Sequence, residues 1–127
     1  MQRLIYEDAW ARTISEKDRI IIENSFKNAL PKGNSIEITL VRWDMNYKNE
    51  LLLIALIHNY TKHDFPFIKR NLQYVHNGRI FAENTFTYPN LVVQARTSMP
   101  WTFIFPKGSY KENEEFDNGS IEIVDRA

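Results

Sequence analysis

The sequence contains no cysteine, which excludes disulfide bridges and metal sites built on thiolates. It also has no long apolar run, because the longest, residues 51–57, is far shorter than the roughly 20 residues of a membrane-spanning helix. The N-terminal residues reach the acidic pair Glu7 and Asp8 before any apolar signal-peptide region develops. These absences predict a cytoplasmic protein without a membrane span.

An excess of charge of one sign is absent as well, since 16 Lys and Arg residues balance 16 Asp and Glu residues. Without a positive field to attract phosphates, no nucleic-acid partner is predicted. Local charge is confined to Lys69 and Arg70, the only adjacent basic pair, and to an acidic stretch at 112–117. That stretch lacks the ligand spacing of a calcium loop, so we interpret it as a solvated loop.

Chemical motifs of catalysis are also missing. The glycines are few and isolated, which excludes a phosphate-binding loop. Ser98 and Ser15 lack the glycine-flanked elbow of a nucleophilic serine. The three histidines are His58, His63 and His76, and no two of them have the spacing of a metal site, although Asp64 lies beside His63. The sequence therefore predicts no metal, no cofactor and no enzymatic activity.

One helix is predicted near the N-terminus, over about residues 16–30. Ser15 can accept from the free amides of its first turn. Ile22, Phe26 and Leu30 recur at helical spacing and form one apolar stripe. The helix ends at the breakers that begin with Pro31.

The remainder of the chain shows the two-residue period of strands. Alternation from residue 35 changes phase between Leu40 and Arg42, which indicates a bulge. Residues 51–59 are apolar on both faces, as in a central strand. Asn77 and Gly78 predict a tight hairpin turn. A further strand places Trp101, Phe103 and Phe105 on one face, which we expect in the core.

Six to eight short strands after one helix are typical of an antiparallel β-sandwich. The fold class predicted is therefore mainly β, an immunoglobulin-like sandwich with one N-terminal helix, in a single domain of residues 1–127.

Five residues are candidates for a binding surface. Trp43, Tyr47 and Tyr60 have polar neighbours and could present exposed rings to a glycan or another small ligand. Lys69 and Arg70 follow the polar loop 59–66, which offers a surface for a protein partner. A sandwich can also bind a partner through a strand edge. Both alternatives, a protein-interaction module and a glycan-binding module, remain open on these residues.

Four segments are distinctive when taken together: residues 10–19, the helix end at Leu30-Pro31, Ile57-His58-Asn59, and residues 98–106. Together they resemble the SLAP domain of Bacillus-type Firmicutes, the module of accessory Sec system S-layer assembly proteins. The similarity spans about residues 10–110, and its most specific part is the last segment. The resemblance implies a noncatalytic protein that supports export of S-layer proteins, with accessory SecA or the exported protein as partner, at the inner face of the membrane.

Overall fold

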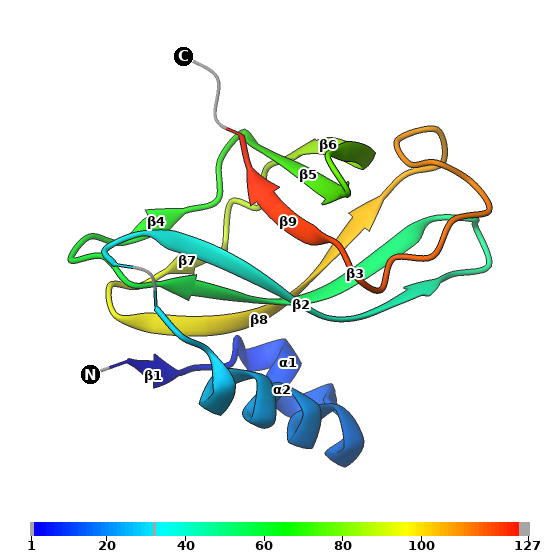
Figure 1. Ribbon diagram of the computed structural model, residues 1–127. Coiled ribbons are helices and arrows are strands. Elements are labelled where there is room, and N and C mark those ends of the chain that lie inside the picture. The colour runs from blue at the N-terminus through cyan, green and yellow to red at the C-terminus, as the bar shows by residue number, and fades with distance from the viewer. Residues whose placement is uncertain (1, 32, 125–127) are drawn as a thin grey trace.

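The computed structural model describes residues 2–31 and 33–124. Two helices lie on one side of the molecule and strands form the rest, which confirms the predicted mainly β fold class (Figure 1). The elements in chain order are β1 (Arg3–Leu4), α1 (Asp8–Thr13), α2 (Glu16–Asn28), β2 (Ile36–Met45), β3 (Leu51–Asn59), β4 (Phe65–Pro66), β5 (Arg70–His76), β6 (Arg79–Phe86), β7 (Val92–Val93), β8 (Thr97–Phe105) and β9 (Ser120–Ile123).

Seven strands join in one sheet in the order β1-β8-β3-β2-β9-β5-β6, and β4 pairs with β7 in a small second sheet. The long sheet folds over at the β2–β9 junction, where Ile38 and Ile121 form the only pair among the residues that the structure describes. As a result β9, β5 and β6 lie on the opposite side of the core from β2, β3 and β8 (Figure 1). The molecule is therefore sandwich-like, with two halves that share one core.

The sheet is mixed, because β1 runs parallel to β8, with Arg3 opposite Thr97 and Leu4 opposite Ser98. The prediction of a purely antiparallel sandwich is wrong at this edge. A strand of two residues has no period that a sequence could reveal. It is held instead by long-range bonds such as that from the Ile5 N–H to the Ser98 carbonyl, at 2.9 Å.

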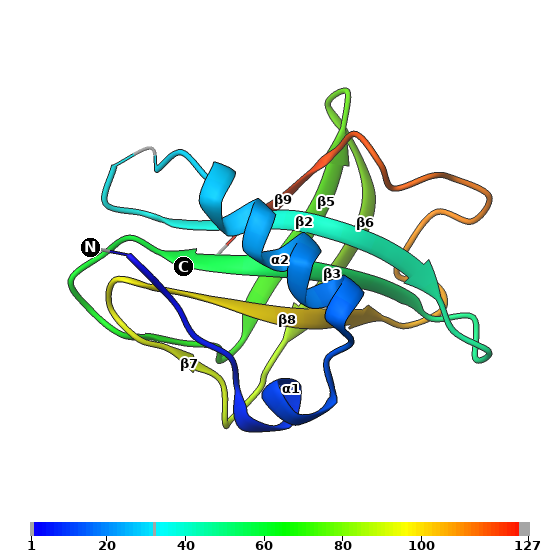
Figure 2. The same cartoon turned by 90° about the horizontal axis from the view of Figure 1, so that it is seen from below.

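The predicted helix is α2. Ser15 caps it, since its Oγ accepts from the Asp18 N–H at 3.1 Å. The helix ends at Asn28, so Leu30 lies beyond it and is 82% exposed rather than part of the apolar stripe. Ile22 is the helix residue that is fully buried. Seen from below, α2 crosses the outer face of β2, β3 and β8 (Figure 2).

The prediction of a single helix is wrong, because α1 precedes α2. Six residues are too few to show an apolar period, and no residue of α1 is buried. Glu7 caps α1 through bonds from the Ala9 and Trp10 N–H groups to its Oε1, at 2.7 and 3.2 Å. No helix in the described part of the chain is long and apolar enough to cross a membrane.

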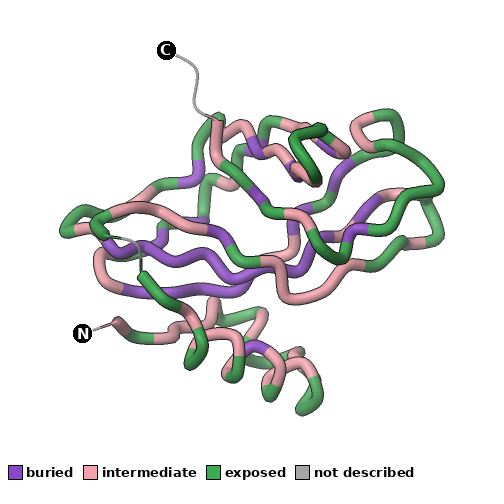
Figure 3. The backbone as a smooth tube through the Cα atoms, in the orientation of Figure 1, coloured by how far each residue is buried: buried purple, intermediate pink, exposed green. Residues whose placement is uncertain are grey.

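The predicted strand features are confirmed. β3 lies between β2 and β8 and is buried along almost its whole length (Figure 3). The register of β2 against β3 shifts between Leu40 and Arg42, at the predicted bulge. Asn77 and Gly78 join β5 to β6 with φ angles of 51° and 76°, as a tight hairpin turn requires.

The aromatic face of β8 is in the core, as predicted, but not uniformly. Phe103 and Phe105 are fully buried and contact Phe86 of β6, with ring centroids 5.4 and 5.0 Å apart. Trp101 is half-buried and meets the Tyr88 ring at 5.3 Å. The two phenylalanines therefore contribute most of the burial from this strand.

Candidate functional site

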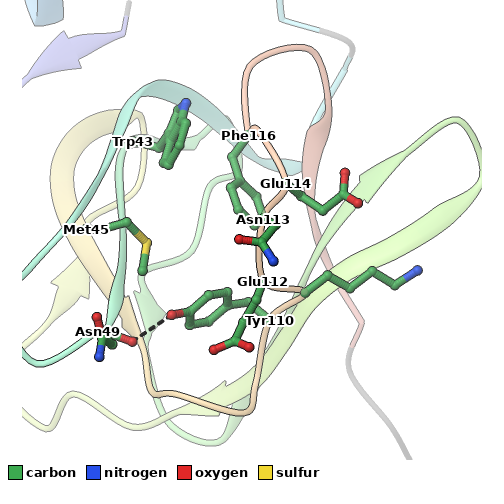
Figure 4. A pocket seen from close by; sticks show the side chains of 9 residues that line it. Trp43, Met45, Asn49, Tyr110, Glu112, Asn113, Glu114 and Phe116 are labelled. Atoms are coloured by element: carbon green, nitrogen blue, oxygen red, sulfur yellow. Dashed lines mark hydrogen bonds between the residues drawn. The ribbon is translucent and has the colours of Figure 1, made fainter.

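A groove of about 380 Å³ opens at one end of the sandwich, between the end of β2 and the loop that follows β8. Its ring and apolar lining comes from Trp43 and Met45 of β2 and from Tyr110 and Phe116 of the loop (Figure 4). Asn113 lies on the loop side, between Tyr110 and Phe116. Concave surfaces lined by rings, with a few polar groups, are the usual form of binding sites.

Phe116 forms the floor of this groove, because its side chain is almost fully buried. The ring meets Trp43 of β2 edge-on at 5.4 Å between centroids. It also contacts Tyr74 of β5 at 5.1 Å and Phe81 of β6 at 6.3 Å. One side chain of the loop therefore packs against strands from both halves of the sandwich.

Two hydrogen bonds hold the loop against the β2–β3 side of the groove. The Trp43 Nε1–H donates to Asp117 Oδ1 at 2.8 Å. The Tyr110 hydroxyl donates to the Asn49 carbonyl at 2.7 Å, the dashed line in Figure 4. Trp43 and Tyr110 stand apart in this view, so the two bonds fix the loop at separate points. The groove is thus formed before any ligand binds.

The turn between β2 and β3 closes one side of the groove. Asn46 organises it, since its Oδ1 accepts from the Lys48 and Glu50 N–H groups, each at 3.0 Å. This pattern accommodates Asn49 at a φ of 59°. Tyr47, on the same turn, is 90% exposed. The turn therefore presents an exposed ring beside the groove, with Lys48 Nζ 5.7 Å from its centroid.

The charge on the groove is negative. Glu112 and Glu114 line it, and both are exposed. Within residues 2–31 and 33–124, neither carboxylate has a hydrogen bond or an ion pair. Lys111 is the one basic residue in the lining, but its Nζ lies over the Phe81 ring, 5.4 Å from the centroid. The Lys111 ammonium group therefore lies toward Phe81 and only partly offsets the negative charge of the two glutamates.

The predicted aromatic candidates do not form one surface. Trp43 lines the groove and Tyr47 lies on the neighbouring turn. Tyr60 follows the far end of β3, which at nine residues spans about 30 Å. It is only 5% exposed and stacks on His58 with centroids 5.3 Å apart. The prediction that Tyr60 is an exposed ring is wrong.

The basic pair lies away from the groove, at the start of β5. Lys69 is exposed, and its backbone N–H donates to Thr87 Oγ1 at 3.0 Å. The Arg70 guanidinium lies over the Phe65 ring at 4.0 Å. Arg70 Nε donates to the Pro66 carbonyl at 3.1 Å. Arg70 is therefore engaged by its own chain, while Lys69 stays accessible.

Sequence reasoning missed the loop side of the groove. Tyr110 and Phe116 sit within or beside the acidic stretch that was interpreted as a solvated loop, an interpretation that holds for the exposed glutamates only. The available signal was the large apolar Phe116 among acidic residues, since a lone phenylalanine in such a stretch usually anchors it.

A second group of polar residues is buried on the outer face of the sheet. The register places Ser98 of β8 opposite His58 of β3, and Ser98 Oγ lies 2.7 Å from His58 Nδ1. Both residues are buried. Gln2 covers them, since its Nε2 donates to Ser98 Oγ and to the Asn59 carbonyl, each at 3.1 Å. Ser98, one of the two serines considered as a nucleophile, thus lies beside a histidine, and both are closed to solvent.

The surroundings of His58 disfavour its charged form. Burial lowers its pKa, and the negative charge of Glu37, its register partner on β2, acts in the opposite direction but less strongly. His58 Nε2 is buried and has no hydrogen-bond partner among the residues that the structure describes. His63 lies in an exposed loop. In the described chain, no group of three His, Asp or Glu residues is arranged to hold a metal ion.

Comparison with known proteins gives one finding. The family model described as the SLAP domain matches residues 4–124. No curated protein and no solved structure matches the chain. The matched range extends beyond both ends of the stretch of about residues 10–110 that carried the resemblance, and it includes the groove.

Proposed function

The chain belongs to the SLAP domain family, and we propose on this basis that it is a noncatalytic protein-interaction module of accessory Sec-dependent secretion. Its partner in this proposal is the accessory SecA or an S-layer protein in transit to the surface. The site of action is the cytoplasm or the inner face of the membrane.

The observation that carries the proposal is the extent of the family match. Residues 4–124 include both helices and all of the strands from β2 to β9. The relation therefore concerns the whole fold rather than one motif within it. A role in S-layer export is what membership of this family suggests.

The noncatalytic part of the proposal is supported by the burial of the most reactive pair. A nucleophilic serine must reach a substrate carbonyl, and its base must exchange protons with the reacting groups. Ser98 and His58 are both buried beneath Gln2. The groove, by contrast, is open and lined by rings, amides and carboxylates, which suits binding.

Glycan binding is the alternative function, and Trp43 and Tyr47 are its remaining candidates. Both lie at the same end of the sandwich, which favours it. Against it, Tyr60 is buried, and the Trp43 indole N–H is already bonded to Asp117. We therefore place protein binding first.

The test of the proposed function uses the native cell. The gene is deleted in a strain that has an accessory SecA, and S-layer protein is measured in the cytoplasm and at the surface. We expect less S-layer protein at the surface and its recovery on complementation. Direct binding is then measured between the purified chain and purified accessory SecA. Unchanged export together with no measurable binding would show that the proposal is wrong.

A further inference from the structure

We propose that the groove between β2 and the 106–119 loop binds an extended segment of the partner in which a lysine or arginine stands next to an apolar side chain. The inference rests on the proposed function, since it supplies the chemistry by which that partner is recognised. Three features of the groove carry it: its size, its apolar lining and its free carboxylates.

The size of the groove limits its occupant. Its volume of about 380 Å³ lies near the lower end of the roughly 300–1,000 Å³ of ligand sites. A few side chains fill such a space, whereas a folded surface requires a much larger contact. Because the hydrogen bonds of Trp43 and Tyr110 already hold the loop, an extended segment can bind without reorganising the groove.

The apolar lining suits the aliphatic part of a basic side chain. Met45 is 38% exposed, and Trp43 and Tyr110 are half-buried, so each offers part of its surface. Long basic side chains commonly lay their methylene stems on such surfaces while the charged head stays near water. The faces of Trp43 and Tyr110 also attract a cation through their ring quadrupoles.

The polar groups decide between a cation and a sugar. The best donors of the groove, the Trp43 indole and the Tyr110 hydroxyl, are used by Asp117 and Asn49. The rim carries the carboxylates of Glu112 and Glu114, which only accept hydrogen bonds, beside the side-chain amides of Asn49 and Asn113, which both donate and accept. A lysine or arginine side chain complements the negative charge of these two carboxylates, whereas a neutral sugar does not. Charge complementarity therefore favours a basic peptide.

The experiment measures fluorescence anisotropy of a short labelled peptide in which lysine alternates with leucine, titrated with the full chain. The matched control probe has glutamate in place of each lysine. The Glu112→Gln/Glu114→Gln variant removes two charges from the groove. The Glu115→Gln/Glu122→Gln variant removes the same charge from exposed positions outside it, on the same loop and on β9. Thermal melts by circular dichroism confirm that both variants fold.

We expect the lysine peptide to bind, more weakly as salt increases, and the glutamate peptide not to bind. The groove variant should bind about fivefold more weakly and the control variant within about twofold of the unmodified chain, the scale of exposed ion pairs. Equal losses in both variants would overturn the inference, because they indicate general charge attraction. Saturable quenching of tryptophan fluorescence by cell-wall oligosaccharides, with no peptide binding, would overturn it in favour of a glycan site.

The same variants separate this inference from the proposed function. If the unmodified chain and the groove variant bind accessory SecA or the S-layer protein equally well, the groove is not the docking site, although the function stands. If the groove variant alone fails to bind and fails to restore export, the groove is the docking site.

Discussion

The buried ring of His58 has one nitrogen, Nε2, without a hydrogen-bond partner in the part of the chain that the structure describes. Burial lowers its pKa from the ordinary value of 6.5, so the folded state resists the proton that the unfolded state accepts. The groups that face it are Ser98, Tyr60 and Glu37. Of these, Glu37 only partly offsets the effect of burial.

We predict that this residue makes stability depend on pH. Because its folded pKa lies below its unfolded pKa, the contribution is fully present above pH 6.5 and is lost as the pH falls towards the folded value. The free energy of unfolding, measured in urea between pH 5 and 8, should therefore decrease on the acidic side. The His58→Gln variant should lose much of this slope, and His63→Gln, in an exposed loop, should retain it. A flat profile for the unmodified chain would contradict the prediction.

Gly119 precedes β9 at a point where the chain passes directly against β5. A methyl group there would lie 2.5 Å from Cζ of Tyr74 and 2.6 Å from the Val75 carbonyl oxygen. The Gly119 N–H also donates to the Tyr74 hydroxyl at 2.7 Å. The position therefore needs glycine for space.

We predict that Gly119→Ala lowers the free energy of unfolding by about 1–3 kcal/mol, the usual cost of overpacking. The Val75 carbonyl belongs to the β5 backbone and cannot move aside easily. Chemical denaturation measures the change, with the exposed neighbour Ser120→Ala as the control, for which we expect less than about 0.5 kcal/mol. Equal stability of Gly119→Ala and the control would show that the strands separate at little cost.

At the scale of elements, β8 contributes unequally to the core along its length. Phe103 contacts Phe86 and Phe67 and is fully buried, whereas Trp101 is half-buried. We therefore predict that Phe103→Ala costs about 3–5 kcal/mol and that Trp101→Ala costs clearly less, roughly 1–2 kcal/mol. Urea denaturation followed by circular dichroism gives both values. A larger loss for Trp101→Ala would mean that the edge of the core, rather than its centre, holds β8.

The elements that were predicted from sequence are those with a local signal. Ser15 supplies a helix cap, Asn77-Gly78 a turn, and residues 51–59 an unbroken apolar run. The elements that were missed, α1 and β1, are short and depend on distant partners. β1 exists only because β8 lies beside it.

The residues of the groove show the same difference between local signals and contacts with distant partners. Trp43 was identified because its neighbours in sequence are polar, which is a local feature. Tyr60 was misjudged because its neighbours in sequence are polar, although its ring stacks on His58 in the fold. Tyr110 and Phe116 lie more than 60 residues after Trp43, and only the folded chain brings them together. No local sequence pattern predicts that these side chains line one groove.

At the scale of the whole molecule, the two halves of the sandwich are joined by a few backbone links and by many side chains. Among the described residues, Ile38 and Ile121 form the only pair between β2 and β9, and the loop after β8 forms a backbone bridge to β6 between Tyr110 and Ala82. Across the core, Phe86 of β6 packs against β8, and Phe116 contacts strands of both halves. Because the backbone links are few, cooperativity between the halves depends mainly on the shared core.

The positions of the three tryptophans allow this to be tested, since Trp10, Trp43 and Trp101 all belong to the half that contains β8, β3 and β2. Tryptophan emission thus reports unfolding of one half, and amide hydrogen exchange in β5 and β6 reports the other. Because the halves share one core, we predict a single transition with the same urea midpoint for both probes. In Phe116→Ala, which removes the ring that contacts both halves, β5 and β6 should lose protection at lower urea than the tryptophans report. If the probes already separate in the unmodified chain, the halves unfold independently and the shared core does not couple them.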